Sequence, residues 1–157
     1  MCASWRVRRA SLALSAVVAL GCALLAPVAQ AQIADRVHET NGIIFVSGGI
    51  GADSREQLAA REKSYNFKLI TTLEGSGKFV TAAQVTLTSA TGAKLVEHVT
   101  EGPILLMGLP AGAYVISATF RGMTRTRKIQ VRAERLLTEY MRWPADAEDG
   151  VLPPEPK

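Results

Sequence analysis

The two histidines are the side chains of this sequence best suited to acid–base or metal chemistry. His38 lies in an N-terminal segment that we expect to be flexible, and His98 lies in a predicted strand. The sequence contains no His-x-His or His-x-x-x-His spacing of the kind common in zinc sites, and no nucleophile elbow for Ser-His-Asp chemistry. We therefore expect no metal site, no cofactor and no catalytic centre. We interpret His98 as a solvated or hydrogen-bonded strand residue.

A glycine-rich turn, Gly48-Gly49-Ile50-Gly51, lies between an apolar run at 43–46 and a predicted helix. Backbone N–H groups in such a turn, together with the helix N-terminus, can receive an anion. The spacing matches neither a dinucleotide-binding fingerprint nor a phosphate-binding loop with its Lys-Ser/Thr pair. We interpret the glycines as a tight reversal with positive φ, and keep a ligand-binding or hydrolytic site at this turn as the alternative.

A dense basic stretch is the third candidate site. Strand alternation places Arg125 and Arg127 on the same face as Ile129 and Val131, a mixture that a β-bulge or a projecting strand end would explain. The stretch could contact acidic lipids, peptidoglycan or an acidic partner, or it could be a solvated run that protects an edge strand. The candidate interaction patch comprises Arg121, Arg125, Arg127, Lys128 and Arg132, with Arg135 close behind.

Residues 1–31 have the features of a secretory signal peptide. Arg6, Arg8 and Arg9 form a basic region, an apolar run follows at 11–20, and Ala29-Gln30-Ala31 supplies a small-x-small cleavage site. The apolar run is shorter than the approximately 20 residues that a transmembrane helix needs. We expect cleavage before Gln32 and a periplasmic or secreted protein without a transmembrane segment.

Two alternative export signals overlap this leader. Arg8-Arg9 resembles a twin-arginine signal, but Ser11 stands where that signal has a large apolar residue. Leu20-Gly21-Cys22 resembles a lipoprotein cleavage box, which would lipidate Cys22. Ala19 occupies the usual Leu position of that box, so we favour the site at Ala29-Gln30-Ala31.

Removing the leader changes the charge and the cysteine content. The full chain has 18 basic and 14 acidic residues; three of the basic ones and none of the acidic ones precede Gln32, which leaves a net charge of about +1. Such a balance does not favour nucleic acid as a partner. Both cysteines, Cys2 and Cys22, lie in the leader, so the remaining 126 residues form no disulfide and must be stabilised by burial.

The elements that would position these residues are mostly strands. Tyr114, Ile116, Ala118 and Phe120 alternate with polar residues after a Pro110–Gly112 turn, which is typical of a half-buried strand. Similar patterns with turns between them predict an all-β, seven-stranded antiparallel β-sandwich with one short N-terminal helix. We expect Tyr114 and Trp143 in its core. The predicted strands are 66–73, 83–89, 94–100, 104–107, 114–120, 124–131 and 136–143.

The flanking segments differ from this pattern. Residues 32–66 are predicted to hold a short strand and a weakly apolar helix, capped by Asp53 or Ser54 and continuing to about Ser64. The tail 144–157 is rich in proline and acidic residues, so we expect it to be disordered. This division leaves 67–143 as the sandwich.

The segment from Gly108 to Tyr114, with its Leu-Pro-Ala-Gly-Ala-Tyr sequence and the following strand pair around Gly122, resembles the carboxypeptidase regulatory-like domains. The strand and turn from Val85 to Gly92 are similar to that family's opening. The resemblance covers roughly 67–143 and extends to exported bacterial proteins that carry this domain. It implies a prealbumin/transthyretin-like sandwich that is a non-catalytic adjunct.

Two chemically active relatives of that fold lack their key residues here. Transthyretin-like hydroxyisourate hydrolases end in Tyr-Arg-Gly-Ser, whereas this chain ends Pro-Pro-Glu-Pro-Lys. Pilin-like sandwiches cross-link a lysine to an asparagine on the last strand, whereas the only asparagines here are Asn41 and Asn66. The sequence thus predicts a non-enzymatic interaction module of the cell envelope, with a protein or polysaccharide partner bound through sheet edges or the basic stretch. The alternative is a small periplasmic ligand-binding protein or hydrolase that uses the Gly48–Gly51 turn.

Overall fold

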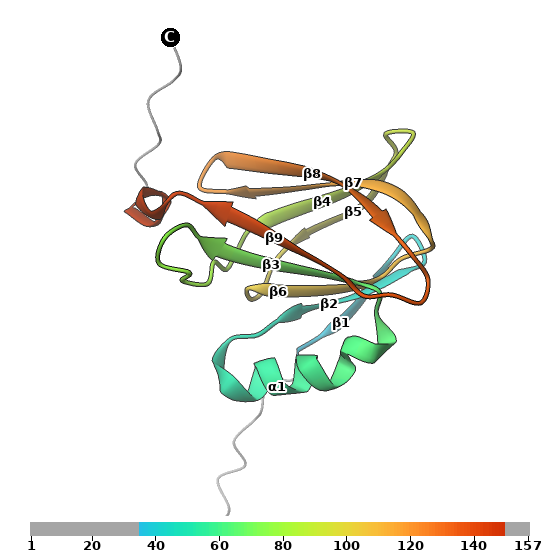
Figure 1. The fold of residues 1–157 in the computed structure, drawn as a ribbon, viewed down its shortest axis with the longest axis horizontal. Helices are drawn as coiled ribbons and strands as arrows, with labels where there is room; N and C mark the ends of the chain where they lie inside the picture. The colour runs from blue at the N-terminus through green and yellow to red at the C-terminus, as the bar shows by residue number, and fades with distance from the viewer. Residues whose placement is uncertain (1–34, 150–157) are drawn as a thin grey trace, which may run out of the picture. The chain divides into compact units, whose positions relative to one another are not determined.

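Two β-sheets face each other across an apolar core, as the ribbon in Figure 1 shows. The structure is a computed structural model that describes residues 35–149. The described elements are, in chain order, β1 (Val37–Thr40), β2 (Ile43–Gly48), α1 (Gly51–Arg61), η1 (Glu62–Ser64), β3 (Phe67–Leu73), β4 (Gln84–Ser89), β5 (Lys94–Val99), β6 (Ile104–Gly108), β7 (Gly112–Phe120), β8 (Met123–Val131), β9 (Leu137–Trp143) and η2 (Ala145–Asp149).

The all-β class and the short N-terminal helix are confirmed, but the strand inventory differs from the prediction. Within residues 35–149 there are nine strands instead of seven, in sheets of order β1-β2-β6-β3-β9 and β5-β4-β7-β8. One pair is not antiparallel, because β9 lies parallel to β3 from Phe67↔Leu137 to Leu73↔Trp143. Periodicity along the chain reports which face of a strand is buried, not the direction of its neighbour.

The two additional strands come from the segment that was predicted to precede the sandwich. The apolar run at 43–46 forms β2, which pairs with β6 in the middle of the first sheet. The first sheet therefore includes residues 37–48, which lie N-terminal to the predicted boundary at residue 67. β1 pairs with β2 through a hairpin at Asn41-Gly42, where both residues have positive φ. Asn-Gly is the sequence that favours such two-residue hairpins.

The core follows the alternation predicted from the sequence. Tyr114, Ile116 and Ala118 of β7 point inward between less buried neighbours, and Trp143 at the end of β9 is fully buried. The Trp143 indole Nε1–H donates to the Met123 carbonyl at 2.9 Å, which ties the edge of one sheet to the edge of the other. The core positions of both aromatic residues are confirmed.

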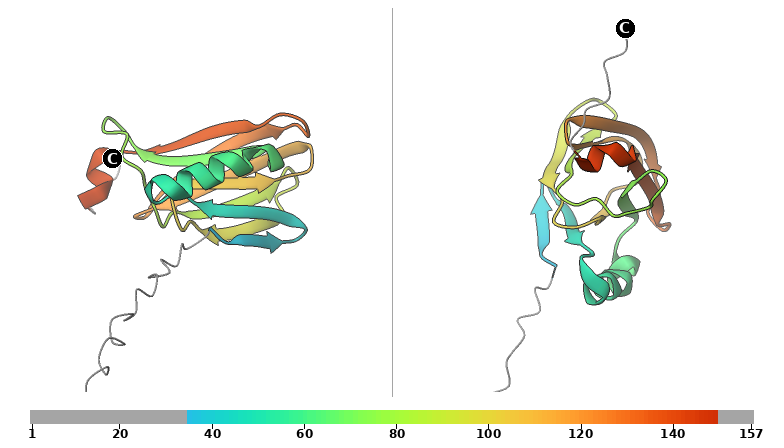
Figure 2. Two further views of the ribbon diagram at one scale, coloured as in Figure 1. Left: turned by 90° about the horizontal axis from the view of Figure 1, so that it is seen from below. Right: turned by 90° about the vertical axis from the view of Figure 1, so that its left-hand side faces the viewer.

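Helix α1 covers the outer face of the first sheet, as the left view of Figure 2 shows. Its one buried residue, Leu58, packs with Val46 of β2 and with Ile104 and Leu106 of β6. This explains why 104–107 is apolar at every position, since β6 is covered on both faces. The helix begins at Gly51, so Asp53 and Ser54 lie in its first turn and are not its cap.

The Leu109–Tyr114 turn is held by two side chains. The Tyr114 hydroxyl donates to the Pro110 carbonyl at 2.8 Å. The buried Asn66 amide accepts from the Leu109 N–H at 2.8 Å, and its Nδ2 donates to the Leu109 and Arg132 carbonyls at 2.7 and 3.2 Å. Asn66 therefore connects its own loop to the Leu109 turn and to the Arg132 connection.

The two ends of the chain are only partly described. Residues 145–149 form η2 and Ala147 is fully buried, so this part of the tail is ordered, contrary to the prediction. Residues 150–157, and the predicted signal peptide with both cysteines, lie outside the described residues. Within 35–149, no helix combines the length and the hydropathy required to cross a membrane.

Candidate functional site

The predicted basic patch divides over two faces of β8. Arg125 and Arg127 have the inward parity of Ile129 and Val131, and the register with β7 is continuous, so no bulge is present in this pair. Their side chains are nevertheless exposed, and they line a groove at the edge of this sheet. Lys128 lies on the opposite, outer face, the face on which Thr126 hydrogen-bonds Ser117. Arg121 lies in the β7–β8 turn, with a φ of 48°.

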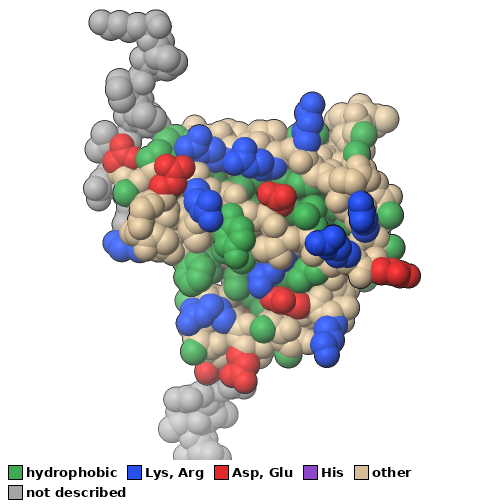
Figure 3. Space-filling model, in the orientation of Figure 1, with side chains coloured by type: hydrophobic (Ala, Val, Ile, Leu, Met, Phe, Trp, Pro, Cys, Tyr) green, Lys and Arg blue, Asp and Glu red, His purple; other side chains and the backbone are tan. Residues whose placement is uncertain are grey.

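A polar groove separates β8 from β9 beside Arg125 and Arg127. Its volume is about 340 Å³, and Arg142 of β9 and Glu74 also line it. The Arg125 Nε–H donates to the Arg142 carbonyl at 3.1 Å, and its Nη2 lies 3.8 Å from the Glu74 carboxylate. Arg127 has no ion pair with another described residue. Figure 3 shows Lys and Arg side chains gathered along this edge of the molecule.

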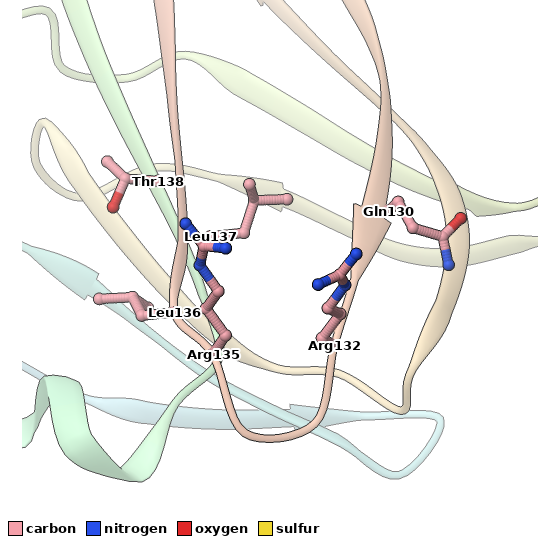
Figure 4. Close-up of a pocket in the computed structure, with 6 residues that line it drawn as sticks. All are labelled: Gln130, Arg132, Arg135, Leu136, Leu137 and Thr138. Carbon is pink, nitrogen blue, oxygen red and sulfur yellow. The ribbon is translucent and has the colours of Figure 1, made fainter.

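A second groove of about 460 Å³ continues between the same two strands. Arg132 and Arg135 face it from the two sides of the β8–β9 connection, as the close-up in Figure 4 shows. We call the two grooves together the basic seam. Its arginines are Arg125, Arg127, Arg132, Arg135 and Arg142, and the only carboxylate among the residues that line either groove is Glu74.

The structure brings together more of the basic seam than the sequence predicted. Arg125, Arg127 and Arg132 were in the predicted patch, whereas Arg142 was not. Spacing in the sequence does not predict that Arg142 lies beside β8, because β8 and β9 belong to different sheets and meet only where the two sheets pack together. Arg121 and Lys128, which the sequence also assigned to the patch, do not line either groove.

The glycine turn is filled by the chain's own side chains. The Gly49 N–H donates to Ser54 Oγ at 2.7 Å, and the Ser54 hydroxyl contacts both Asp35 carboxylate oxygens at 2.7 and 2.9 Å. A Cβ at Gly48 would lie 2.0 Å from the Asp35 carboxylate, so only glycine leaves room for it. A carboxylate of this chain thus lies at the turn, linked to the Gly49 N–H through the Ser54 hydroxyl.

A cluster that the sequence did not predict joins the other two sheet edges. His38 of β1, His98 of β5 and Glu101, two residues beyond β5, each place one ligand atom within 4.8 Å of the others. His38 Nε2 lies 3.6 Å from Glu101 Oε1, and the two imidazole centroids are 4.7 Å apart. The expectation that His38 lies in a flexible segment is wrong, since it pairs with Phe45 in the β1–β2 ladder.

The surroundings of the cluster are aromatic. The buried Phe45 ring stacks on His38 at 5.2 Å and meets His98 edge-on at 5.0 Å. Burial lowers the pKa of His98, the neighbouring His38 lowers it further, and Glu101 acts in the opposite direction. This shift favours the neutral imidazole of His98, which has a lone pair on one ring nitrogen.

One signal in the sequence could have placed His38. The Asn41-Gly42 pair predicts a hairpin, and a two-residue hairpin there puts His38 opposite Phe45. The approach of His98 depends on how the second sheet packs, which no spacing encodes.

No protein-family model matches this sequence, and no curated protein matches it either.

Proposed function

We propose that this chain is an exported, non-catalytic β-sandwich that binds an acidic segment of a partner protein in the basic seam. The observation that carries the proposal is the charge of that seam, where five arginines face a single carboxylate. The glycine turn already holds Asp35 through Ser54, which disfavours the alternative of an anion-binding or hydrolytic site there.

The chemistry of arginine favours a carboxylate-bearing partner. A guanidinium offers up to five N–H donors in a planar fork that matches a carboxylate with two parallel hydrogen bonds. Arg127 is exposed and unpaired within 35–149, so it is free to make such a pair. Several arginines along one groove favour an extended segment with several acidic residues over a single small anion.

The free strand edges favour an extended partner as well. β8 ends one sheet and β9 ends the other, and both edges border the seam. An added strand could hydrogen-bond to either backbone while its acidic side chains reach the arginines. A protein partner can make both kinds of contact, whereas a polysaccharide lacks the regular amide backbone that strand addition uses.

The sequence of the leader supports export, and the sequence of the Gly108–Tyr114 turn supports the proposed family. A basic region, a short apolar run and Ala29-Gln30-Ala31 favour export to the periplasm or beyond, with cleavage before Gln32. The Gly108–Tyr114 sequence and the sandwich support membership of the carboxypeptidase regulatory-like, transthyretin-like family. Under this proposal the domain is an adjunct without chemistry of its own.

The test compares two neighbouring residues of β8 that point to opposite faces. Arg127→Glu reverses a charge inside the seam, and Lys128→Glu reverses the same charge on the outer face. We expect Arg127→Glu to weaken binding of a Glu-rich, fluorescently labelled 12-residue peptide about tenfold or more, because a charge-assisted pair is lost. Lys128→Glu should change the affinity far less, and added salt should weaken binding to the wild type.

Three results would contradict the proposal. Equal losses in the two variants would show that net charge alone governs binding. A wild type that does not bind the peptide at low salt would remove the acidic protein segment as the partner. Equal binding of a soluble acidic polysaccharide would favour a carbohydrate partner instead.

A further inference from the structure

The His38–His98–Glu101 cluster has a feature that packing leaves unexplained. The Nε2 atoms of both histidines are buried, and neither has a hydrogen-bond partner among the described residues. Contact with Phe45 accounts for the positions of the rings, since each ring lies about 5 Å from it. It does not account for two polar nitrogens that are withdrawn from solvent at the same place, because buried polar atoms are almost always paired.

The three side chains form a ligand set for a transition metal. Two imidazole nitrogens and one carboxylate oxygen suit Zn²⁺ and its neighbours, whereas Mg²⁺ and Ca²⁺ prefer oxygen ligands alone. We propose that His38, His98 and Glu101 bind a divalent transition-metal ion, with Zn²⁺ the best match, at the junction of β1 and β5.

The spacing requires only a small closure of the cluster. Tetrahedral ligands at about 2.0–2.1 Å from zinc lie about 3.4 Å from one another. His38 Nε2 and Glu101 Oε1, at 3.6 Å, already have nearly this separation, and the longest separation in the set is at most 4.8 Å. Glu101 is exposed and lies in the turn after β5, so its side chain can rotate toward the histidines.

An ion at this position would join the two sheets. β1 is the edge of one sheet and β5 is the edge of the other. A hydrogen bond from Asn41 Nδ2, in the turn after β1, to the Leu95 carbonyl of β5 also connects them. Three protein ligands also leave at least one coordination position for water or a further ligand. The expected consequence is a metal-dependent rise in thermal stability.

The test uses the full chain, purified without a polyhistidine tag. Cys2→Ser and Cys22→Ser are introduced first, because thiolates in the leader would also bind zinc. ZnCl₂ added to chelator-treated protein should raise the melting temperature and give one site by titration calorimetry. CoCl₂ should give the visible absorption of a four- or five-coordinate site with nitrogen and oxygen ligands.

Single substitutions then separate the ligands from their neighbours. His38→Gln, His98→Gln and Glu101→Gln should each weaken Zn²⁺ binding at least about tenfold, since loss of even an outer partner of a ligand costs 10–100-fold. Glu39→Gln, next to His38 on the other face of β1, should bind as the parent does. Histidine ring NMR signals of the folded parent should shift with Zn²⁺, whether or not a variant is less stable.

Two outcomes would overturn the inference. The parent protein could show no zinc-dependent change in melting temperature, calorimetry or histidine signals. Alternatively, zinc could bind equally well to the parent and to all three ligand variants, which would place the ion elsewhere. Neither outcome bears on the basic seam, which lies between β8 and β9.

Discussion

Tyr114 is one of the two residues whose side chains hold the Leu109–Tyr114 turn. Its ring is buried in the core, and its hydroxyl reaches back to the Pro110 carbonyl at 2.8 Å. Burial raises the pKa of the phenol. In the unfolded chain the same phenol has an ordinary pKa of about 10, so it ionises there first.

Because the pKa of Tyr114 is raised, we expect its contribution to the stability of the fold to decrease at alkaline pH. The contribution of Tyr114 to stability is complete below a pH of about 10 and decreases as the pH rises above it, because ionisation then favours the unfolded state. Tyr114→Phe should be less stable by about 1 kcal/mol at neutral pH, since it loses one hydrogen bond. The difference in free energy of unfolding between the two proteins should shrink from pH 8 to about 11.

Urea unfolding at each pH measures this difference. Tyr140→Phe is the control, because Tyr140 is exposed on β9 and lies outside the turn that Tyr114 holds. The prediction would be contradicted if the difference in free energy of unfolding between the wild type and Tyr114→Phe stayed constant over the pH range.

Individual residues also show where sequence reasoning succeeds and where it stops. Alternation identified Tyr114 as a core residue and placed Arg125 and Arg127 on one face. It could not identify His38 as a neighbour of His98, because their contact is made between two sheets and spans 60 positions of the chain. Local periodicity contains no information on which two edges will meet.

Among the elements, α1 depends on a small apolar contact. Leu58 is its one buried residue, and the rest of its inner surface is intermediate or exposed. Leu58→Ala should lower the free energy of unfolding by about 2–3 kcal/mol, at the low end for a buried leucine, because the site is near the surface and can relax. Backbone amides of α1 should exchange with solvent much faster, while those of β6 stay protected.

Hydrogen exchange with mass spectrometry resolves these two regions. Glu56→Ala, on the exposed face of the same helix, should change neither the stability nor the exchange of α1 by much. Equal loss of protection in α1 and β6 after Leu58→Ala would show instead that the helix and the sheet unfold as one unit.

The elements themselves were predicted unevenly. Seven predicted strands correspond to β3–β9, because each has a clear alternating or apolar pattern bounded by turn residues. β1 was missed, since Val-His-Glu-Thr has no apolar alternation and only its Asn41-Gly42 turn marks it. Residues 145–149 were assigned to a disordered tail because composition outweighed Ala147, whose burial is a tertiary contact.

On the scale of the whole molecule, the two open sides of the sandwich differ in chemistry. One side, between β8 and β9, carries arginines. The other, between β1 and β5, carries two histidines and a glutamate. The two sites share no residue, so loss of one should leave the other intact.

The proposed export of the molecule has a direct measurement. Expressed in a bacterial host with an intact secretory pathway, the protein should be recovered from the periplasm with an intact mass that begins at Gln32. A chain that begins at Cys22 with added lipid mass would identify a lipoprotein. A chain of full length in the cytoplasm would contradict export.

The parallel pairing of β3 with β9 has a consequence for how the chain folds. The paired residues are separated by 70 positions, from Phe67↔Leu137 to Leu73↔Trp143. Contacts of such long range are slow to form, and this one cannot form until the ribosome has synthesised the chain to Trp143. Until then β3 remains an unpaired edge beside an incomplete core, and a nascent or truncated chain is open to aggregation. β9, the last of the described strands, therefore covers this edge of β3 and ends the period in which the chain is prone to aggregation.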